Sequence, residues 1–232
     1  MKFIVVGLGI FGASLAEKLT SRGNEVIGID SCMERVNAMK DLITNTVCMD
    51  ATEQTSISNL PLSNTDIVII CIGENQGANI MATALFKNMN VKRLISRSNN
   101  PLHENVLLAI GVHEIVRPEE ETAERWAKKI CLKNVVDSFE LNDNYSIIEV
   151  HVPKQHIGKT IKEMDFRKNY NLLVLTTIKN TEVSSIVGRK RLIANVQGIP
   201  DPDTPFAEDD VLVIYGSNKN LGKFIGKTVS LY

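Results

Sequence analysis

Residues 2–12 read KFIVVGLGIFG, and this stretch decides the fold of the first half of the chain. An apolar run leads directly into glycines spaced as G-x-G-x-x-G, and an amphipathic helical pattern follows over residues 10–21. A glycine-rich turn between a first strand and a first helix is typical of a dinucleotide-binding sheet. Gly7 permits the sharp turn, Gly9 leaves room for a diphosphate, and Gly12 lets the helix approach the strand. The amides at the helix start can then donate to phosphate oxygens.

The alternation of apolar strands and helical patterns continues to about residue 116. We expect strands at residues 2–6, 25–29, 45–48, 66–72, 91–96 and 113–116, and helices at residues 10–21, 32–40, 53–59, 75–88 and 101–110. Strands that are apolar throughout are typical of a parallel sheet covered on both faces. The sequence therefore predicts an α/β fold with a Rossmann-type doubly wound parallel sheet.

The composition changes after this sheet. Residues 118–133 begin with a run of glutamates and end with lysines. This order of charges matches the dipole of a single helix, so we expect these residues to form a crossover helix. Beyond it we expect short strands at residues 138–141, 146–152, 172–178 and 211–215, and helices at residues 158–164 and 218–225. Residues 1–133 are predicted to form the nucleotide-binding domain, and residues 134–232 a second, smaller α+β domain.

Composition excludes several classes of partner. A net charge of -1 over 232 residues gives no field that would collect nucleic acid. The four cysteines form no C-x-x-C pair, which argues against a zinc site, and no metal site is expected. Cys48 and Cys71 lie in apolar strand-like runs, so we expect reduced core thiols and a reducing cytosol. The N-terminal apolar run is interpreted as a strand rather than a secretory signal, and no apolar stretch approaches the ~20 residues that span a bilayer.

Asp30 ends the second predicted strand, at the position from which a carboxylate binds ribose hydroxyls. A 2′-phosphate would be repelled there, which disfavours NADP. Arg35, on the next helix, is either a ligand of such a phosphate or a solvated helix residue. Ligands of open α/β sheets lie beyond the carboxyl ends of the strands. This rule adds residues 50–52 after the third strand, residues 73–75 after the fourth, and Arg97 after the fifth.

Each of these polar positions also has a simpler interpretation. Asp50 or Thr52 would equally serve as a helix cap, and Arg97 as a surface charge. The four histidines, at positions 103, 113, 151 and 156, are not paired with an acid in any recognisable motif. A dehydrogenase needs such a proton donor or acceptor, so no catalytic residue is assigned and no enzyme is expected. A small NAD-dependent oxidoreductase remains the alternative, followed by a stand-alone nucleotide-sensing domain; a Rossmann sheet whose site has decayed would bind nothing.

The ordered set of these motifs resembles a known family. GLGIFG at residues 7–12, Asp30, DATE at 50–53, IGEN at 72–75 and RPE at 117–119 are similar to the RCK proteins, and the chain is identified as a member of the KtrA/TrkA family. The resemblance covers essentially the whole chain, including an RCK C-terminal (TrkA-C) domain in the second half. No single motif is specific, but the ordered set is.

The resemblance implies a cytosolic regulatory (gating) subunit of a potassium transporter. Family members dimerise through the crossover helix, and the homodimers assemble into a ring, expected to be an octamer, at the inner face of the plasma membrane. The ring lies beneath an integral-membrane potassium-translocating subunit. ATP, ADP or NAD(H) in the Rossmann crevice changes the shape of the ring and so the conductance of the partner.

The expected nucleotide contacts combine the topology and the resemblance. They are Gly7, Gly9, Ile10, Phe11, Gly12, Asp30, Ser31, Arg35, Asp50, Ala51, Thr52, Ile72, Gly73, Glu74, Asn75, Arg97 and Glu119. Glu119 matches a family acid near the dimer interface that approaches bound nucleotide or a cation.

Two positions bear on the choice of ligand. Many relatives carry an arginine where this chain has Ile10, and that arginine meets phosphates; its loss is expected to weaken binding of a triphosphate and to favour NAD or ADP. Some relatives bind cyclic di-AMP between two C-terminal domains, and Arg167 and Asn171 fall near the corresponding segment. Residues 189–205 are longer than usual there, and a dimer interface without ligand is the alternative.

Overall fold

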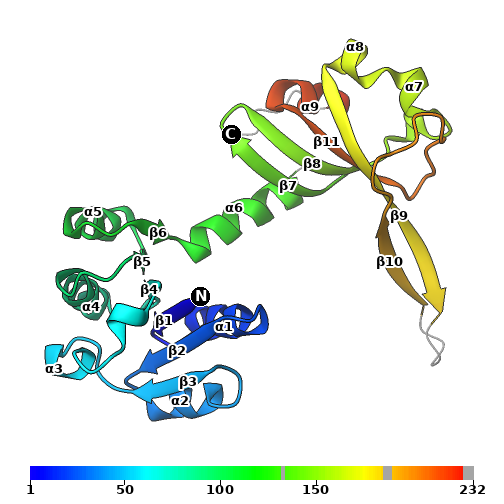
Figure 1. The fold of residues 1–232 in the computed structure, drawn as a ribbon. Helices are drawn as coiled ribbons and strands as arrows, with labels where there is room; N and C mark the ends of the chain where they lie inside the picture. Colours follow the sequence, from blue (N-terminus) through cyan, green and yellow to red (C-terminus); the bar gives the residue numbers. More distant parts are fainter. Residues whose placement is uncertain (132–133, 185–189, 227–232) are drawn as a thin grey trace. The chain divides into compact units, whose positions relative to one another are not determined.

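The computed structural model describes residues 1–131, 134–184 and 190–226 (Figure 1). The chain forms two compact units, Met1–Glu120 and Glu121–Tyr232. A domain boundary after residue 133, as expected from the sequence, stays a prediction, because residues 132 and 133 lie outside the described residues.

The first unit contains the predicted alternation of strands and helices. Its elements are β1 (Lys2–Val6), α1 (Ile10–Ser21), β2 (Glu25–Asp30), α2 (Met33–Met39), β3 (Asn45–Cys48), α3 (Gln54–Ile57), the 3-10 turn η1 (Leu62–Asn64), β4 (Ile67–Ile70), α4 (Gln76–Asn88), β5 (Leu94–Arg97), α5 (Pro101–Ile110) and β6 (Glu114–Val116). The ends differ from those expected by a few residues only.

The six strands form one parallel sheet in the order β3-β2-β1-β4-β5-β6. Alternate residues of β1 enter different cores: Phe3 and Val5 pack in the cluster with α1 and α2, and Ile4 and Val6 in the cluster with α3 and α4. Helices therefore cover both faces, as the uniformly apolar strands predict. The strand order reverses between β1 and β4, and this reversal opens a crevice at the carboxyl ends of the strands.

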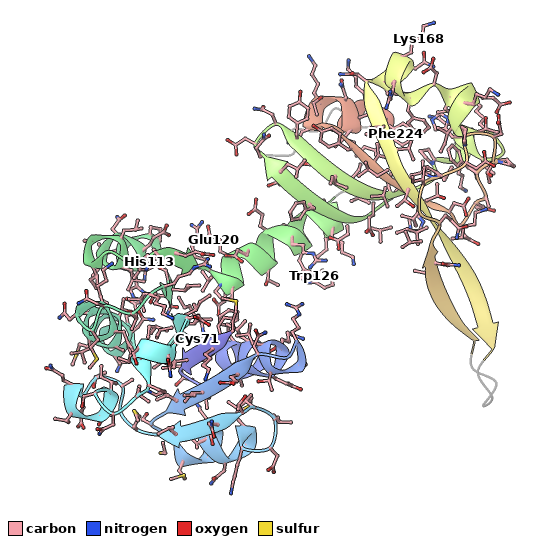
Figure 2. All side chains as sticks on the ribbon, viewed as in Figure 1. Cys71, His113, Glu120, Trp126, Lys168 and Phe224 are labelled. Carbon is pink, nitrogen blue, oxygen red and sulfur yellow. The ribbon has the colours of Figure 1, made fainter. Side chains whose placement is uncertain are left out.

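The two cysteines expected in the core have different environments. Cys71, labelled in Figure 2, is buried after β4, and burial raises the pKa of its thiol to about 12, which the positive charge of Arg97 opposes. Such a thiol stays protonated and unreactive. The expectation for Cys48 is wrong, because this residue is exposed. It ends β3, which is an edge strand and lacks a neighbour on one side.

The predicted crossover helix is α6 (Pro118–Cys131). Arg125 on this helix forms an ion pair with Asp137 of the following strand, in which Arg125 Nε lies 3.1 Å from Asp137 Oδ1. The side chain of Trp126, labelled in Figure 2, is exposed on α6. Ile130 on the same helix is also exposed. Over the part of the chain that the structure describes, no helix is both long enough and apolar enough to cross a bilayer.

The second unit is an antiparallel sheet with short helices packed on it. Its elements are β7 (Val135–Asn142), β8 (Tyr145–His151), the 3-10 turn η2 (Lys154–His156), α7 (Ile161–Met164), α8 (Phe166–Tyr170), β9 (Leu172–Ser184), β10 (Lys190–Val196), β11 (Val211–Ser217) and α9 (Asn218–Phe224). The strand order is β10-β9-β11-β8-β7. Phe166 and Phe224 on the helices close its core over Ile148, Leu212 and Ile214.

Three elements of this unit, η2, α8 and β10, are absent from the sequence-based expectation, as is the outer part of β9. Residues 178–184 of β9 pair with residues 190–196, which form β10 (Figure 1). The sequence of β10, KRLIANV, shows no strict alternation of apolar and polar residues, and β10 pairs only with β9 at the edge of the sheet. The helix α8 has only five residues and begins where the side chain of Asp165 accepts a hydrogen bond from Lys168 N.

Candidate functional site

A cavity of about 790 Å³ lies at the carboxyl ends of the parallel strands. This volume is in the range of cavities that hold small ligands. Fifteen of the seventeen expected contacts line it: Gly7, Gly9, Ile10, Asp30, Ser31, Arg35, Asp50, Ala51, Thr52, Ile72, Gly73, Glu74, Asn75, Arg97 and Glu119. Residues from six separate segments therefore meet at one place.

The other two expected contacts, Phe11 and Gly12, do not line the cavity but pack against residues that do. A Cβ atom on Gly12 would overlap the carbonyl oxygen of Gly7, so glycine is required for α1 to approach the turn. The ring of Phe11 lies under Arg97, with 6.0 Å between the guanidinium carbon and the ring centroid. This cation–π contact helps to hold the arginine in place.

The glycine turn follows from backbone geometry. Gly7 has a φ of +93°, and a Cβ atom on it would lie 2.9 Å from the backbone nitrogen of Ile72. Gly9 is the N-cap of α1, and a Cβ atom there would meet open space. Because glycine has no side chain to accept from the first helical amides, an anion at the start of α1 can take these donors.

Asp30 is 7% exposed and joins two backbone segments. Its Oδ2 accepts a hydrogen bond from Leu8 N at 2.7 Å, and its Oδ1 accepts one from Cys32 N at 2.8 Å. The carboxylate thus holds the glycine turn against the turn after β2. Each oxygen retains a second acceptor position, which a ribose hydroxyl can use.

The two arginines of the cavity wall are both paired with acids. Arg35 Nη2 lies 2.8 Å from Glu74 Oε1, and this hydrogen bond raises the pKa of Arg35. Arg97 pairs with Glu119. The Arg97 side chain is only 17% exposed, which excludes a simple surface charge, and among the described residues its Nε has no hydrogen-bond partner.

Gly73 provides the space that Arg97 occupies. A Cβ atom on Gly73 would lie 2.6 Å from the guanidinium carbon of Arg97, so any other residue would displace the arginine. The side chain of Asn75 caps α4 by accepting from Ala78 N at 3.0 Å. The turn after β4 therefore has one residue that makes room for Arg97 and one that starts a helix.

The turn after β3 is closed by Asp50. Its Oδ1 accepts from Thr52 N at 2.8 Å and from Thr52 Oγ1 at 2.7 Å. The backbone hydrogen bond is the main cause of a lowered pKa of Asp50. The N-cap of α3 is Glu53, so neither Asp50 nor Thr52 caps that helix. The helix-cap interpretation is therefore wrong for both residues.

The charges on the cavity wall are unbalanced. Its ionised side chains are four carboxylates and two guanidiniums, namely Asp30, Asp50, Glu74, Glu119, Arg35 and Arg97. Ile10, the first residue of α1, is 96% exposed at this site. Positive potential for an anion therefore comes from the start of α1 and from arginines that already have acidic partners.

Seven further lining residues were not expected from the sequence: Val6, Ile29, Met49, Cys71, Gly77, Ala78 and Met81. The first four each precede an expected contact by one residue, so extending the strand-end rule by one position would have found them. The last three lie on α4, and their exposure to the cavity depends on how that helix rotates on the sheet. The sequence carries no signal for this rotation.

Three of the four histidines, at positions 103, 113 and 156, contact other groups of the fold, and His151 is exposed. His103 is buried on α5, and His113 Nδ1 accepts from Leu94 N at 2.9 Å. His156 is buried in the second unit, where its ring stacks on Phe224. Within residues 1–131, 134–184 and 190–226, no group of three His, Cys, Asp or Glu side chains is arranged to hold a metal ion.

In the second unit, Arg167 lies in α8 and Asn171 ends it in the left-handed conformation with a φ of 53°. Neither residue lines a cavity of about 490 Å³ in that unit, whose walls include His156, Lys159 and Tyr170.

Comparison with known proteins assigns the family. Residues 3–118 match the TrkA-N domain. The Ktr system potassium uptake protein C of Bacillus subtilis (strain 168) is 32% identical over 223 residues, which are 96% of this chain and 95% of the relative. The chain belongs to the KtrA/TrkA family.

Other comparisons agree with membership of the KtrA/TrkA family. The Ktr system potassium uptake protein A of the same organism is 30% identical, again over 96% of this chain and 95% of the relative. Among solved structures, a GsuK channel bound to NAD has a TM-score of 0.65 at 18% identity and matches 99% of this chain and 40% of that chain. The GsuK RCK domain has a TM-score of 0.64 at the same identity, over 99% of this chain and 48% of that chain. At this identity the likeness shows the fold alone.

Proposed function

We propose that this chain is a nucleotide-binding regulatory subunit of a potassium transport system and has no enzymatic role. The single observation that carries the proposal is the cavity at the strand reversal. There the glycine turn, Asp30 and two arginines from separate elements meet. Membership of the KtrA/TrkA family supports potassium transport as the regulated process, because the relatives are named potassium uptake proteins.

An adenine nucleotide fits the arrangement in one orientation. The diphosphate lies against Gly9 and accepts hydrogen bonds from the first amides of α1. The ribose hydroxyls donate to the remaining acceptor positions of Asp30, whose Oδ2 lies 2.7 Å from Leu8 N of the glycine turn. The adenine ring lies toward the Asp50–Thr52 turn, where Met49 and Ala51 provide apolar surface.

The charges of the wall favour NAD or ADP over ATP. A third phosphate would add negative charge to a site with twice as many carboxylates as guanidiniums. Ile10 supplies no cation at the start of α1, so the extra phosphate gains no charge-assisted hydrogen bond there. Asp30 would repel the 2′-phosphate of NADPH. Titration of the purified chain with ATP, ADP, NADH and NADPH tests this order, and tightest binding of ATP would contradict it.

The Arg97–Glu119 ion pair is the coupling element of the proposal. Glu119 is the second residue of α6, and this helix continues from the first unit into the second. A phosphate that binds Arg97 competes with Glu119 for the same guanidinium. Nucleotide binding can therefore break the contact between Arg97 and the start of α6. A ligand shifts a conformational equilibrium only by its different affinity for the two states, and this competition provides such a difference. Coupling of this kind is typically ~1–3 kcal/mol per site.

The assembly follows from the family. We propose homodimers formed through α6, where Trp126 and Ile130 expose apolar surface. The dimers are proposed to assemble into an octameric ring at the cytoplasmic face of an integral-membrane potassium-translocating subunit. Cyclic di-AMP binding by the second domain, near Arg167 and Asn171, stays a separate prediction. Nucleic acid has no part in the proposal.

Reconstitution tests the function directly. The chain is purified with its membrane partner in potassium-loaded vesicles, and potassium flux is recorded with and without NADH, ADP and ATP. We expect flux to depend on nucleotide, and this dependence to disappear without the regulatory chain. Potassium flux that is the same with and without each of the three nucleotides would refute the proposal. Oxidation of NADH by the chain with a carbonyl substrate would favour an oxidoreductase instead.

A further inference from the structure

A buried polar network lies outside the residues that line the cavity. Asn79 of α4 is fully buried, and its side-chain nitrogen donates to two backbone carbonyls, Ile72 O at 2.9 Å and Arg97 O at 3.1 Å. Ile72 follows β4, Arg97 ends β5, and both line the cavity. One side-chain amide therefore joins the two strand ends that carry this part of the wall.

The orientation of the Asn79 amide follows from its partners. Carbonyl oxygens only accept hydrogen bonds, so the NH2 group must face Ile72 and Arg97, and Oδ1 must face the other way. On that side Ser96 Oγ donates to Oδ1 at 3.1 Å, and His103 Nε2 lies 3.2 Å from it. Because Oδ1 can only accept, His103 must carry a proton on Nε2.

The second ring nitrogen of His103 completes the assignment. Asn99 N donates to His103 Nδ1 at 3.4 Å, so Nδ1 carries no proton and the ring is neutral. Burial lowers the pKa of His103, which also favours the neutral ring. The side chain of Asn99 donates to the carbonyl oxygen of Gly73 and so links the same two segments a second time.

We propose that Asn79 is a positioning residue for the nucleotide site, and that neutral His103, protonated on Nε2, holds the Asn79 amide in the orientation that joins the ends of β4 and β5. The inference rests on the proposed function, because it concerns the same cavity. Asn79 and His103 do not line the cavity, so their effect on a ligand passes through Ile72, Gly73 and Arg97. A binding group is effective only when the structure around it fixes its place.

Three variants separate positioning from stability. His103→Leu removes the donor at Nε2, whereas His103→Gln places an amide nitrogen near the same point. Thr83→Val is the matched control: Thr83 is fully buried, and its hydroxyl lies 3.1 Å from Ser96 Oγ and 3.5 Å from Asn79 Oδ1 but contacts neither carbonyl. In this variant Ser96 and His103 still contact Asn79 Oδ1, so the amide keeps its orientation. ADP affinity is measured by calorimetry and Tm by thermal unfolding for each full-length variant.

We expect His103→Leu to bind ADP about tenfold more weakly than the wild type, which is the low end of what partners behind a binding group contribute at metal sites. His103→Gln should recover most of this loss. Thr83→Val should lower the Tm and leave the ADP affinity unchanged. If His103→Leu lowers the Tm as Thr83→Val does and binds ADP with wild-type affinity, the positioning role is wrong and the network serves stability alone.

Nitrogen-15 NMR of histidine-labelled full-length chain reads the tautomer without any nucleotide. We expect the His103 signal, identified by its loss in His103→Gln, to show a protonated Nε2 and an unprotonated Nδ1 at pH 7. A proton on Nδ1 would overturn the assigned orientation of Asn79 and the proposal with it. If the wild type shows this tautomer but binds neither ADP nor NADH, the proposed function fails and the positioning role fails with it, while the assigned tautomer stands.

Discussion

Replacing Gly9 by alanine is expected to separate ligand binding from folding. Gly9 has a φ of -67° and a ψ of -172°, which alanine adopts without strain, and the added Cβ would meet no protein atom within 4 Å. The free energy of unfolding should therefore stay unchanged or rise by about 0.5 kcal/mol, because alanine restricts the unfolded chain. The new methyl group occupies the space that the proposal assigns to the diphosphate.

The expected loss of affinity follows from the hydrogen bonds that the methyl group disrupts. A diphosphate moved away from the backbone loses at least one charge-assisted hydrogen bond from the start of α1, which costs about 2 kcal/mol. This corresponds to a Kd about 30-fold higher. Calorimetric titration of wild type and Gly9→Ala with ADP and with NADH measures the change.

Gly12→Ala provides the contrasting control three residues away. Its Cβ would overlap the Gly7 carbonyl oxygen and lie 3.0 Å from Cys71 Cβ, so overpacking should cost about 1–3 kcal/mol and lower the Tm by about 5 °C or more. Gly9→Ala should show the opposite pattern, with a normal Tm and weak binding. A folded Gly9→Ala that binds ADP and NADH like the wild type would refute the placement of the diphosphate.

Three further predictions concern charge. Glu119→Gln should fold normally, because Glu119 is mostly exposed. It should bind ADP several-fold more tightly in calorimetry, because Arg97 no longer has a competing carboxylate. Potassium flux through the complex that contains this variant should also depend differently on nucleotide. Ile10→Arg should lower the Kd for ATP relative to that for ADP by about tenfold, since it adds one charge-assisted contact to the third phosphate. Burial lowers the pKa of His103 and His156 below the usual 6.5, so the unfolded chain binds more protons and the free energy of unfolding should fall as pH decreases through about 6.5.

Each of these has a clear contrary result. Weaker ADP binding by Glu119→Gln would mean that Glu119 supports the ligand instead of competing with it. An unchanged ratio of ATP to ADP affinity in Ile10→Arg would show that residue 10 does not meet the third phosphate. Denaturant unfolding at pH 7.5, 6.5 and 5.5 measures the third effect, and a stability that rises toward acid would contradict the neutral state of the two buried histidines.

The sequence predicted most of the first unit because its local signals agree with its packing. Four of the strands end at a residue of the site or within three residues before one, so topology alone places Gly7, Asp30, Asp50 and Gly73 together. The ion pairs of the two arginines could not be predicted in this way. That Arg35 meets Glu74, and that Arg97 meets Glu119, depends on side-chain directions across separate elements, which a spacing argument does not contain.

The failures of prediction also have physical causes. Cys48 lies in an apolar run, but its strand is at the sheet edge, and strand order is a property of the whole sheet. Strand β10 is at the sheet edge and pairs only with β9, and its sequence does not alternate strictly between apolar and polar residues. The role of Asn79 could not be predicted from the sequence. A polar residue in a predicted helix is expected to be solvent-exposed unless its partners, here two backbone carbonyls, are known.

A crystal structure of the chain with NADH or ADP tests the central claim most directly. We predict that the diphosphate lies against Gly9, within hydrogen-bond distance of the amides at the start of α1, and that a ribose hydroxyl donates to the carboxylate of Asp30. A nucleotide bound elsewhere, or crystals grown at saturating nucleotide in which side chains fill the cavity, would contradict it.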